Sequence, residues 1–338
     1  MVLPADSSFD AFSAAEFARS LQAALRQRGP LVDRPDLTAY RVLDGAGDNA
    51  PGVSIDRYGA AAVLNVHDDL RLSHAAVTEM AAVVLDVLAP GGVAAVYVKA
   101  FARDRSRRGG DLPGEASVAT PRAGVVLPET LVVTEYDTRF EVRPYDGLST
   151  GLFLDHREHR QALAARRPHR ALNLFAYTCA FAVPLAAAGA AVTNVDVSGR
   201  YLEWGRRNLA LNGLEASPMR FLRRHAMEFL SQAARRPDER FDLVILDPPT
   251  FGAANRRRGV DAWRAVDDYP ALVAAAVGVL SPRGVVFAAS NTRELAAAGA
   301  LRAVVSAALT RAPRWLPLPP WPLDVREPNR VAAVLFAP

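Results

Sequence analysis

Hydrophobic and polar positions follow a regular alternation in the second half of the chain. Short apolar runs alternate with amphipathic stretches, which is the pattern of repeated strand–helix units. The apolar runs predict strands at residues 171–176, 192–197, 219–222, 241–246, 285–289 and 331–336. The stretches between them predict helices at residues 180–188, 200–211, 227–234, 263–280 and 293–309. This alternation predicts an α/β fold with a doubly wound, mostly parallel sheet.

The first half of the chain has a different pattern. Amphipathic periodicity predicts helices at residues 13–28 and 72–88, and apolar pieces predict strands at residues 53–56, 61–66 and 93–98. A hairpin is expected at residues 131–136 and 139–142, after an exposed loop at residues 103–128. We therefore expect a small α+β domain at residues 1–144, preceding the α/β domain at residues 145–338.

Composition narrows the class of protein. The chain has 338 residues, half of them hydrophobic, but shows no apolar run near the ~18–20 residues of a membrane span. It also shows no N-terminal secretory signal. Cys179 is the only cysteine, so we expect a reducing, cytoplasmic location and no multi-cysteine zinc site. The histidines show no paired metal-ligand spacing, and His156 and His159 are expected to flank a helix start. We expect no metal and no membrane partner.

The basic residues favour an anionic partner. The formal net charge is +4, and Lys99 is the only lysine, so nearly all positive charge is arginine. Arginine makes planar, bidentate contacts with phosphate. Clusters occur at residues 103–108, at Arg223 and Arg224, and at Arg256, Arg257 and Arg258. A solvated face is the ordinary explanation of such clusters, but the last one closely follows a candidate site and predicts contact with nucleic acid.

The candidate site is the end of the strand predicted at residues 241–246. There the sequence reads Asp247-Pro248-Pro249-Thr250-Phe251. The two prolines donate no N–H, so the strand cannot continue. The expected result is a stiff ledge with free carbonyls, a carboxylate and an aromatic ring, placed where ligands bind in open α/β sheets. Such a ledge suits a planar nitrogen heterocycle. The structural alternative is a proline-terminated strand with a packed phenylalanine.

A second candidate residue lies at the end of the strand predicted at residues 192–197. Asp196 follows the first strand–helix turn by about 20 residues, where an acid can bind ribose hydroxyls. The alternative is that Asp196 caps the next helix, a role that Ser198 could fill equally well. The first turn, residues 173–181, is not the G-x-G-x-x-G motif of dinucleotide-binding folds, and the chain has no P-loop.

Together these segments resemble a known family. Residues 146–160, 173–181, 195–204, 208–214 and 247–251 resemble, in order, the class I S-adenosylmethionine-dependent methyltransferases. The similarity is greatest to the bacterial 23S rRNA large-subunit methyltransferases, which include a guanine-N7 enzyme. Residues 44–59 resemble the small domain that precedes the catalytic domain in that family. The resemblance implies a Rossmann-like, seven-stranded sheet and S-adenosylmethionine as cofactor.

The resemblance also implies roles for matched positions. It places Phe153, Asp155 and Arg157 over the cofactor and its methionyl end, and residues 173–178, including Asn173, Phe175, Tyr177 and Thr178, beneath that end. Asp196 would hold the ribose, Val197 would pack on the adenine, and His225 takes the place of the acid that faces the adenine. Ser198, Ala226 and Asp247 are also expected to contact the cofactor. It implies that Asp247, Pro248 and Pro249 border the reacting centre, with Phe251 near the incoming base.

The sequence departs from the family at three points. His225 stands where the family has an aspartate, which puts cofactor affinity in doubt. Cys179 stands where glycine is common, and we interpret it as a small buried residue rather than a nucleophile. The N-terminal RNA-binding module of many relatives is not evident, which weakens an rRNA assignment.

The chemistry implied for the site does not require a thiol. Methylation at pyrimidine carbon 5 needs a nucleophilic cysteine, which in the cytosine-modifying relatives follows the fifth strand. Here that segment reads Ser290-Asn291-Thr292, which resembles the guanine-N7 members, and Asn291 could read a base edge or simply end the strand. The sequence therefore predicts methylation of an rRNA base at a ring nitrogen such as guanine N7.

Two alternatives stay open: a small-molecule methyltransferase and an RNA-binding protein without catalysis. The oligomeric state is open between a monomer and a homodimer.

Overall fold

The computed structural model describes residues 13–67, 70, 72–101, 118–147, 149–214, 218–252, 263–326 and 330–338. Contacts divide the chain into two compact units. The first comprises Met1–Leu154 together with Pro322–Glu327, and the second comprises Asp155–Trp321 together with Pro328–Pro338. The chain therefore passes from one unit to the other three times.

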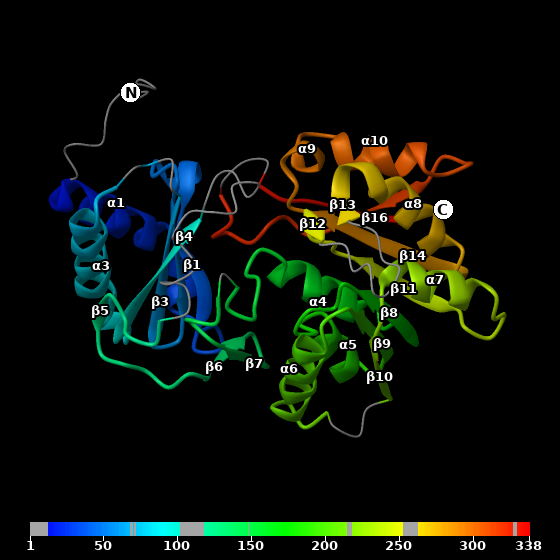
Figure 1. Ribbon diagram of the computed structural model, residues 1–338, viewed down its shortest axis with the longest axis horizontal. Coiled ribbons are helices and arrows are strands. Elements are labelled where there is room, and N and C mark those ends of the chain that lie inside the picture. Colours follow the sequence, from blue (N-terminus) through cyan, green and yellow to red (C-terminus); the bar gives the residue numbers. More distant parts are fainter. Residues whose placement is uncertain are drawn as a thin grey trace. The chain divides into compact units, whose positions relative to one another are not determined.

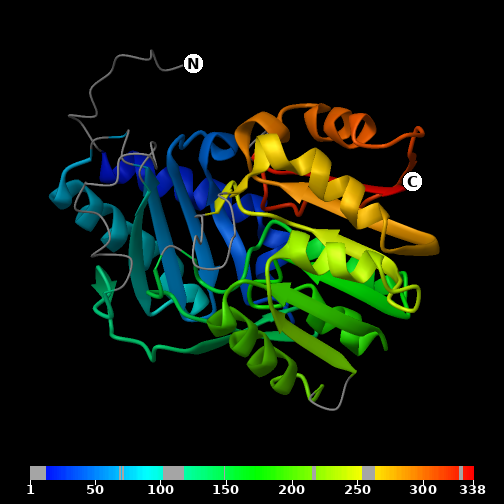
Figure 2. The same cartoon turned by 45° about the vertical axis from the view of Figure 1, so that its right-hand side comes forward.

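The first unit contains a five-stranded mixed sheet. Its strands lie in the order β1 (Ala39–Asp44), β2 (Val53–Tyr58), β3 (Ala61–His67), β4 (Ala95–Phe101) and β5 (Ala123–Gly124). Only β3 and β4 are parallel, since helix α3 (His74–Leu88) connects them. Helices α1 (Ala14–Gln27) and α3 bury their apolar sides on one face of this sheet (Figure 2). The short elements are α2 (Gly29–Val32), η1 (Gly45–Asp48) and η3 (Ala89–Gly91), and the predicted hairpin is formed by β6 (Leu131–Glu135) and β7 (Thr138–Val142).

The sequence showed no apolar run long enough to span a membrane, but one helical stretch of this unit meets the criteria of length and hydropathy for a span. Residues His74–Gly91 have the length and the mean hydropathy, 1.2, of a candidate span, with 22% of the window buried. Within α3, Met80, Ala81 and Val84 are buried in the core of the unit. A helix that contributes one face to a protein core passes the same test.

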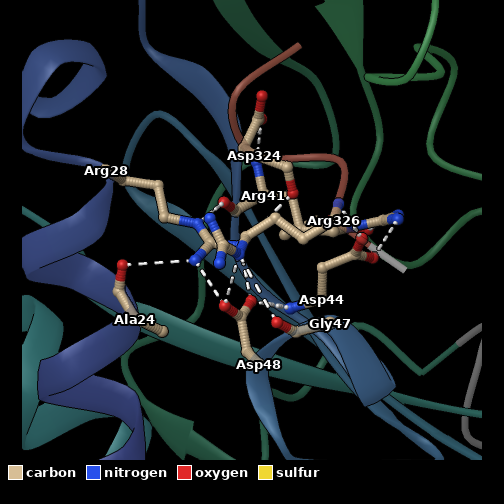
Figure 3. Close-up of polar contacts among 9 residues, drawn as sticks. Ala24, Arg28, Arg41, Asp44, Gly47, Asp48, Asp324 and Arg326 are labelled. Atoms are coloured by element: carbon tan, nitrogen blue, oxygen red, sulfur yellow. Dashed lines mark hydrogen bonds and ion pairs between the residues drawn. The ribbon is translucent and has the colours of Figure 1, made fainter. Parts of the chain in front are cut away.

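The segment Pro322–Glu327 is held in the first unit by buried charges (Figure 3). The carboxylate of Asp324 accepts a hydrogen bond from the backbone N–H of Arg41 at 2.8 Å. The backbone N–H of Arg326 donates to Asp44 at 2.6 Å, and its guanidinium lies 3.1 Å from Asp48. Asp48 also accepts from the buried Arg28 side chain at 2.8 Å. Ion pairs and backbone bonds together fix this segment to β1 and η1.

The second unit is the predicted doubly wound α/β domain. Its sheet has the order β10 (Met219–Arg223), β9 (Ala191–Asp196), β8 (Arg170–Leu174), β11 (Phe241–Leu246), β14 (Leu280–Ser290), β16 (Ala332–Ala337) and β15 (Arg314–Leu316). The first five strands are parallel, and β16 runs antiparallel to both of its neighbours. The predicted seven-stranded, mostly parallel sheet is confirmed.

Helices cover both faces of this sheet (Figure 1). Side chains alternate along β11: Leu243 and Ile245 join one core, while Val244 and Leu246 join the other. One core includes residues of α4 (Arg157–Ala165), α5 (Ala182–Ala187) and α6 (Gly199–Ala210). The opposite core includes residues of α7 (Ala226–Ala234), α8 (Ala265–Val277), α9 (Arg293–Ala296) and α10 (Ala300–Ala307).

Several element predictions differ from the structure. The helix expected at residues 293–309 is two helices, α9 and α10, because the chain turns at Gly299 with a φ of 78°. The helix expected at residues 263–280 begins as strand β13 (Trp263–Arg264), which pairs with β12 (Phe251–Gly252). Strand β15 was not among the strands predicted from the apolar runs, since three residues give no visible alternation.

Candidate active site

Asp196, Asp247 and the residues next to them lie at one edge of the sheet in the second unit. Strands β10, β9, β8, β11 and β14 are parallel, so their carboxyl ends share this edge. The chain order reverses between β8 and β11, because β9 and β10 lie on one side of β8 while β11 and β14 lie on the other. This is the topological switch point at which open α/β sheets bind their ligands.

The turn after β8 has an unusual backbone. Phe175, Tyr177 and Cys179 adopt φ angles of 55°, 48° and 60°, a region that non-glycine residues seldom occupy. Hydrogen bonds hold the turn: the N–H of Ala176 donates to Val195 at 3.1 Å, and the N–H of Cys179 donates to Ala176 at 2.7 Å. Backbone strain of this kind concentrates at functional sites, where surrounding contacts maintain it.

Asp196 connects this turn to the next helix. Its Oδ2 accepts from the N–H of Tyr177 at 2.9 Å, and its Oδ1 accepts from the N–H of Ser198 at 2.8 Å. Ser198 itself caps α6, because its hydroxyl accepts from the N–H of Tyr201 at 3.3 Å. The capping alternative for Asp196 is therefore wrong. Each carboxylate oxygen has a second lone pair, so the group can still accept from a ligand hydroxyl.

The surroundings of Asp196 are partly apolar. Burial raises the pKa of its carboxyl above the ordinary value, although the backbone N–H bonds oppose that shift. The adjacent Val197 side chain is 57% exposed. A carboxylate beside an exposed aliphatic side chain suits a ribose hydroxyl next to a base. The backbone of Asp196 is also bonded to the residue that follows β10, because the N–H of Arg224 donates to the carbonyl of Asp196 at 3.0 Å.

Two residues predicted to contact the cofactor support the turn from inside the domain. Asn173 is buried, and its amide donates to Asn194 on β9 at 3.0 Å. Thr178 is fully buried, and its carbonyl accepts from the Asn208 side chain at 2.9 Å. Both positions stabilise the base of the site. Their contact with a cofactor stays a prediction.

The end of β11 forms the predicted ledge, with one correction. β11 ends at Leu246, and Asp247 and the prolines follow it. The carbonyls were expected to be free, but that of Pro249 accepts from the indole N–H of Trp263 at 2.7 Å. The carbonyl of Thr250 accepts from Ala265 at 3.1 Å. These bonds fix the ledge to β13 and to the start of α8.

Phe251 and Asn291 lie at the ledge as well. The ring of Phe251 is 60% exposed, so the packed-phenylalanine alternative is wrong. The hydroxyl of Thr250 donates to the amide oxygen of Asn291 at 3.1 Å, and Thr292 lies 3.3 Å from the same hydroxyl. The end of β14 is thus joined to the end of β11. This bond uses the amide oxygen of Asn291, and the contact of its NH2 group with a base edge stays a prediction.

A buried histidine pair behind the ledge was missed as part of the site. His156 is the N-cap of α4 and is 3% exposed, while His159 is 2% exposed. Their Nδ1 atoms lie 3.1 Å apart, and Nε2 of His156 lies 3.9 Å from Oδ1 of Asp247. The sequence signal was limited to two histidines three residues apart at a helix start. Their approach to Asp247 depends on the tertiary fold.

The remaining predicted residues fall in three places. Phe153 belongs to the first unit and is 47% exposed. Asp155 is half-buried in the second unit, where Arg157 is fully buried and lies 3.4 Å from Glu158. His225 occupies the N-cap position of α7 without a side-chain capping bond, and Ala226 is buried. The predicted cluster Arg256, Arg257 and Arg258, like the arginines of residues 103–108, lies outside the described residues. Cofactor and substrate contacts of all these residues stay predictions.

Comparison with known proteins identifies the family. A family model described as an S-adenosylmethionine-dependent methyltransferase matches residues 118–312, more than half of the chain. The chain belongs to the S-adenosylmethionine-dependent methyltransferase family. S-adenosylmethionine is accordingly the cofactor of this family member. The partly exposed Asp196 carboxylate and the exposed Val197 fit its ribose and adenine.

Curated relatives of this methyltransferase are named as rRNA enzymes. The chain is 35% identical over 282 residues to ribosomal RNA large subunit methyltransferase I of Klebsiella pneumoniae, which covers 82% of this chain and 66% of the relative. It is 29% identical over 283 residues to ribosomal RNA large subunit methyltransferase K/L of Shewanella pealeana, covering 83% and 38%. The chain thus spans just under two thirds of the length of the first relative.

Solved structures show the same fold. SMU.776 complexed with SAH superposes with a TM-score of 0.83 at 24% identity, over 97% of this methyltransferase and 82% of that chain. A SAM-dependent methyltransferase from Agrobacterium tumefaciens superposes with a TM-score of 0.60 at 22% identity, over 90% of each chain. At these identities the likeness supports the fold alone.

Proposed function

We propose that this methyltransferase modifies a base of large-subunit rRNA at a ring nitrogen such as guanine N7. The observation that carries the proposal is the ledge after β11, where Asp247 and the exposed ring of Phe251 lie at the topological switch point. The names of the curated relatives support RNA as the substrate class. A base would have to leave its stack to reach this ledge.

The chain's own residues would bind and orient the reactants. Asp196 would accept hydrogen bonds from the ribose of the cofactor, and Val197 would pack on its adenine. Phe251 would stack on the acceptor base, and the carboxylate of Asp247 would accept from a base N–H. The cofactor, when bound, supplies an electrophilic methyl group. Because a ring nitrogen has its own lone pair, the protein needs only to position it in line with that group.

The carboxylate of Asp247 also suits the charge of the product. Methylation at guanine N7 makes the base cationic, and a fixed anion beside it lowers the free energy of the developing charge. Burial raises the pKa of the Asp247 carboxyl, and the nearby His156 opposes that shift. We expect the ionised form to be active, so activity should fall on the acid side.

The structure also supports the argument against carbon-5 chemistry. Cys179, the only cysteine, is fully buried and packs against Gly205, where even a Cβ would clash with its sulfur. Burial raises the pKa of its thiol far above the ordinary range. A protonated, inaccessible thiol cannot attack a pyrimidine ring.

Transfer of labelled methyl groups tests the proposal. The purified protein would be incubated with methyl-labelled S-adenosylmethionine and with deproteinised rRNA from a strain that lacks its gene. Digestion of the rRNA and chromatography then identify the labelled nucleoside. The expected product is a guanosine methylated at a ring nitrogen. Labelled 5-methylcytidine would contradict the ring-nitrogen proposal, and unlabelled rRNA from a protein that binds the cofactor would favour a small-molecule acceptor.

A further inference from the structure

The histidine pair behind the ledge has a defined hydrogen-bonding problem. Nδ1 of His156 and Nδ1 of His159 lie 3.1 Å apart in a buried setting. Two lone pairs at that distance would repel, and two N–H groups would collide, so one ring must donate and the other must accept. The identity of the donor fixes the tautomer of both rings.

The protonation state of His159 limits which of the two Nδ1 atoms can be the donor. Burial is the largest cause that lowers the pKa of His159 to about 3, and His156 lowers it further. The ring is therefore neutral at physiological pH and carries one proton. If that proton is on Nδ1, His159 donates to His156, and the single proton of a neutral His156 must be on Nε2.

The opposite arrangement is unfavourable at Asp247. If a neutral His156 donated through Nδ1, its Nε2 lone pair would face the carboxylate oxygen of Asp247 at 3.9 Å. With the proton on Nε2, the same contact becomes an N–H directed toward an anion. For a singly protonated His156, the position of Asp247 therefore favours the tautomer in which His159 donates and the N–H of His156 lies on the side of the carboxylate.

We propose that His156 is a positioning residue for Asp247, and that His159 holds it in the tautomer whose Nε2–H faces the carboxylate. The role of Asp247 in methyl transfer rests on the proposed function. Its side chain is 30% exposed although Oδ1 lies 3.9 Å from Nε2 of His156, so the side chain is near the histidine and is not fully enclosed. The histidine would keep the carboxylate ionised and correctly aimed.

The packing around the pair restricts both rings. His156 lies 5.6 Å from the ring of Phe181 and 5.8 Å from that of Phe287, and Trp321 packs edge-on against His159 at 4.6 Å. Among the described residues, the titratable groups that act on the pair and on Asp247 include Asp155 and Arg160, and the buried hydroxyl of Tyr269 interacts electrostatically with Asp247. An aromatic enclosure of this kind resists ring rotation, so the hydrogen-bond direction is built into the fold.

Substitutions at His156 test the role. In His156→Gln an amide N–H can replace the Nε2–H, whereas His156→Phe keeps a ring and removes the donor. We expect His156→Phe to lower kcat for RNA methylation by roughly 100-fold, as for other lost polar contacts at a reacting centre, and His156→Gln to restore most of it. Calorimetric affinity for S-adenosylmethionine should stay unchanged in both. His169→Phe, an exposed position before β8, is the matched control.

The pH profile separates positioning from simple packing. An N–H group beside a carboxylate favours its ionised form, so the loss of His156 should raise the pKa of Asp247 and move the acid limb of the kcat profile to higher pH. Full activity of His156→Phe, equal losses in the Phe and Gln variants, or an unmoved acid limb would each overturn the proposal.

The tautomers can be read without any activity assay. Nuclear magnetic resonance of the intact protein with 15N-labelled histidine distinguishes protonation at Nδ1 from protonation at Nε2. We expect His159 to carry its proton on Nδ1 and His156 on Nε2. The reverse assignment would overturn the inference even if the His156→Phe variant failed to fold. If instead the tautomers are as expected but the wild type methylates no RNA, the proposed function fails and the histidine arrangement stands.

Discussion

Asp196 illustrates how a single side chain can fix the backbone and present a ligand group. Its two oxygens accept from Tyr177 and Ser198, which belong to the turns after β8 and β9. The turn after β8 has no glycine at its left-handed positions, so these bonds help to maintain a strained backbone. The carboxylate was predictable from its place after a strand. The left-handed turn was not, because Phe, Tyr and Cys do not signal positive φ.

Substitution of Asp196 tests its ribose-binding role. In Asp196→Asn, one carboxylate acceptor becomes an NH2 group, which cannot accept from a backbone N–H or from a ribose hydroxyl. We expect affinity for S-adenosylmethionine, measured by calorimetry, to fall by about 10-fold or more. Asp242→Asn is the matched control: Asp242 accepts from His169 and Arg170 at the amino end of β8, away from the carboxyl edge. Equal affinity losses in both variants would assign the effect to general destabilisation.

Lys99 gives a prediction about stability. Its side chain is buried on β4, and among the described residues its Nζ has no hydrogen-bond partner. Burial is the main cause that lowers its pKa from 10.5 to about 8, against the attraction of Asp56 and Asp146. The unfolded chain therefore binds the proton more tightly, so the free energy of unfolding should rise as pH increases from about 8 to 10.5.

The variant Lys99→Met removes the free-energy cost of burying the charged amine. We expect its free energy of unfolding at pH 7 to exceed that of the wild type by about 1–3 kcal/mol, because a charged amine is no longer buried. Its stability should also lose the rise between pH 8 and 10.5. Denaturant unfolding across that pH range measures both effects, with Arg283→Met as an exposed control. A less stable variant would show that the ammonium group has a partner that stabilises it.

At the scale of elements, the ledge depends on a short hairpin that periodicity did not predict. The strand at residues 241–246 and the helix at residues 13–28 were expected from their apolar patterns, and both form within a residue or two. Strands β12 and β13 have two residues each, too few to show a period. Their pairing depends on contacts between Phe251 and Arg264, which local sequence does not reveal.

The indole of Trp263 tests the role of this hairpin. Trp263→Phe keeps an aromatic ring in the core but removes the donor to Pro249. We expect the free energy of unfolding to fall by about 1 kcal/mol, the usual net value of a buried hydrogen bond. We also expect kcat/KM for RNA to fall while cofactor affinity stays the same. Trp315→Phe on β15 provides the same substitution at the far edge of the sheet. An effect on cofactor affinity alone would contradict this assignment.

At the scale of the whole molecule, the division into units is not a single cut in the sequence. Residues Pro322–Glu327 leave the second unit and belong to the first. The sequence does not predict that this segment belongs to the first unit, because the partners of Asp324 and Arg326 lie almost 300 positions earlier, in β1 and η1. Local patterns predicted the two kinds of architecture, α+β and α/β. Only the folded structure shows where this segment packs.

Substitution of the buried Asp324 tests how much the segment Pro322–Glu327 stabilises the first unit. Asp324→Ala leaves the N–H of Arg41 without its acceptor inside a charged cluster. We expect a loss of roughly 1–3 kcal/mol in the free energy of unfolding, measured by denaturant titration. Asp86→Ala on the exposed side of α3 should have almost no effect. Equal stability of the two variants would show that the segment contributes little to the first unit.

The central claim is that the carboxyl edge of the second unit methylates a ring nitrogen in large-subunit rRNA. The most direct measurement compares the modified nucleosides of that rRNA, by mass spectrometry, between the source organism and a strain that lacks the gene. One ring-methylated guanosine should disappear in the deletion strain. It should return with the wild-type gene and stay absent with Asp247→Ala. Identical nucleoside profiles in both strains, or the loss of 5-methylcytidine instead, would contradict the claim.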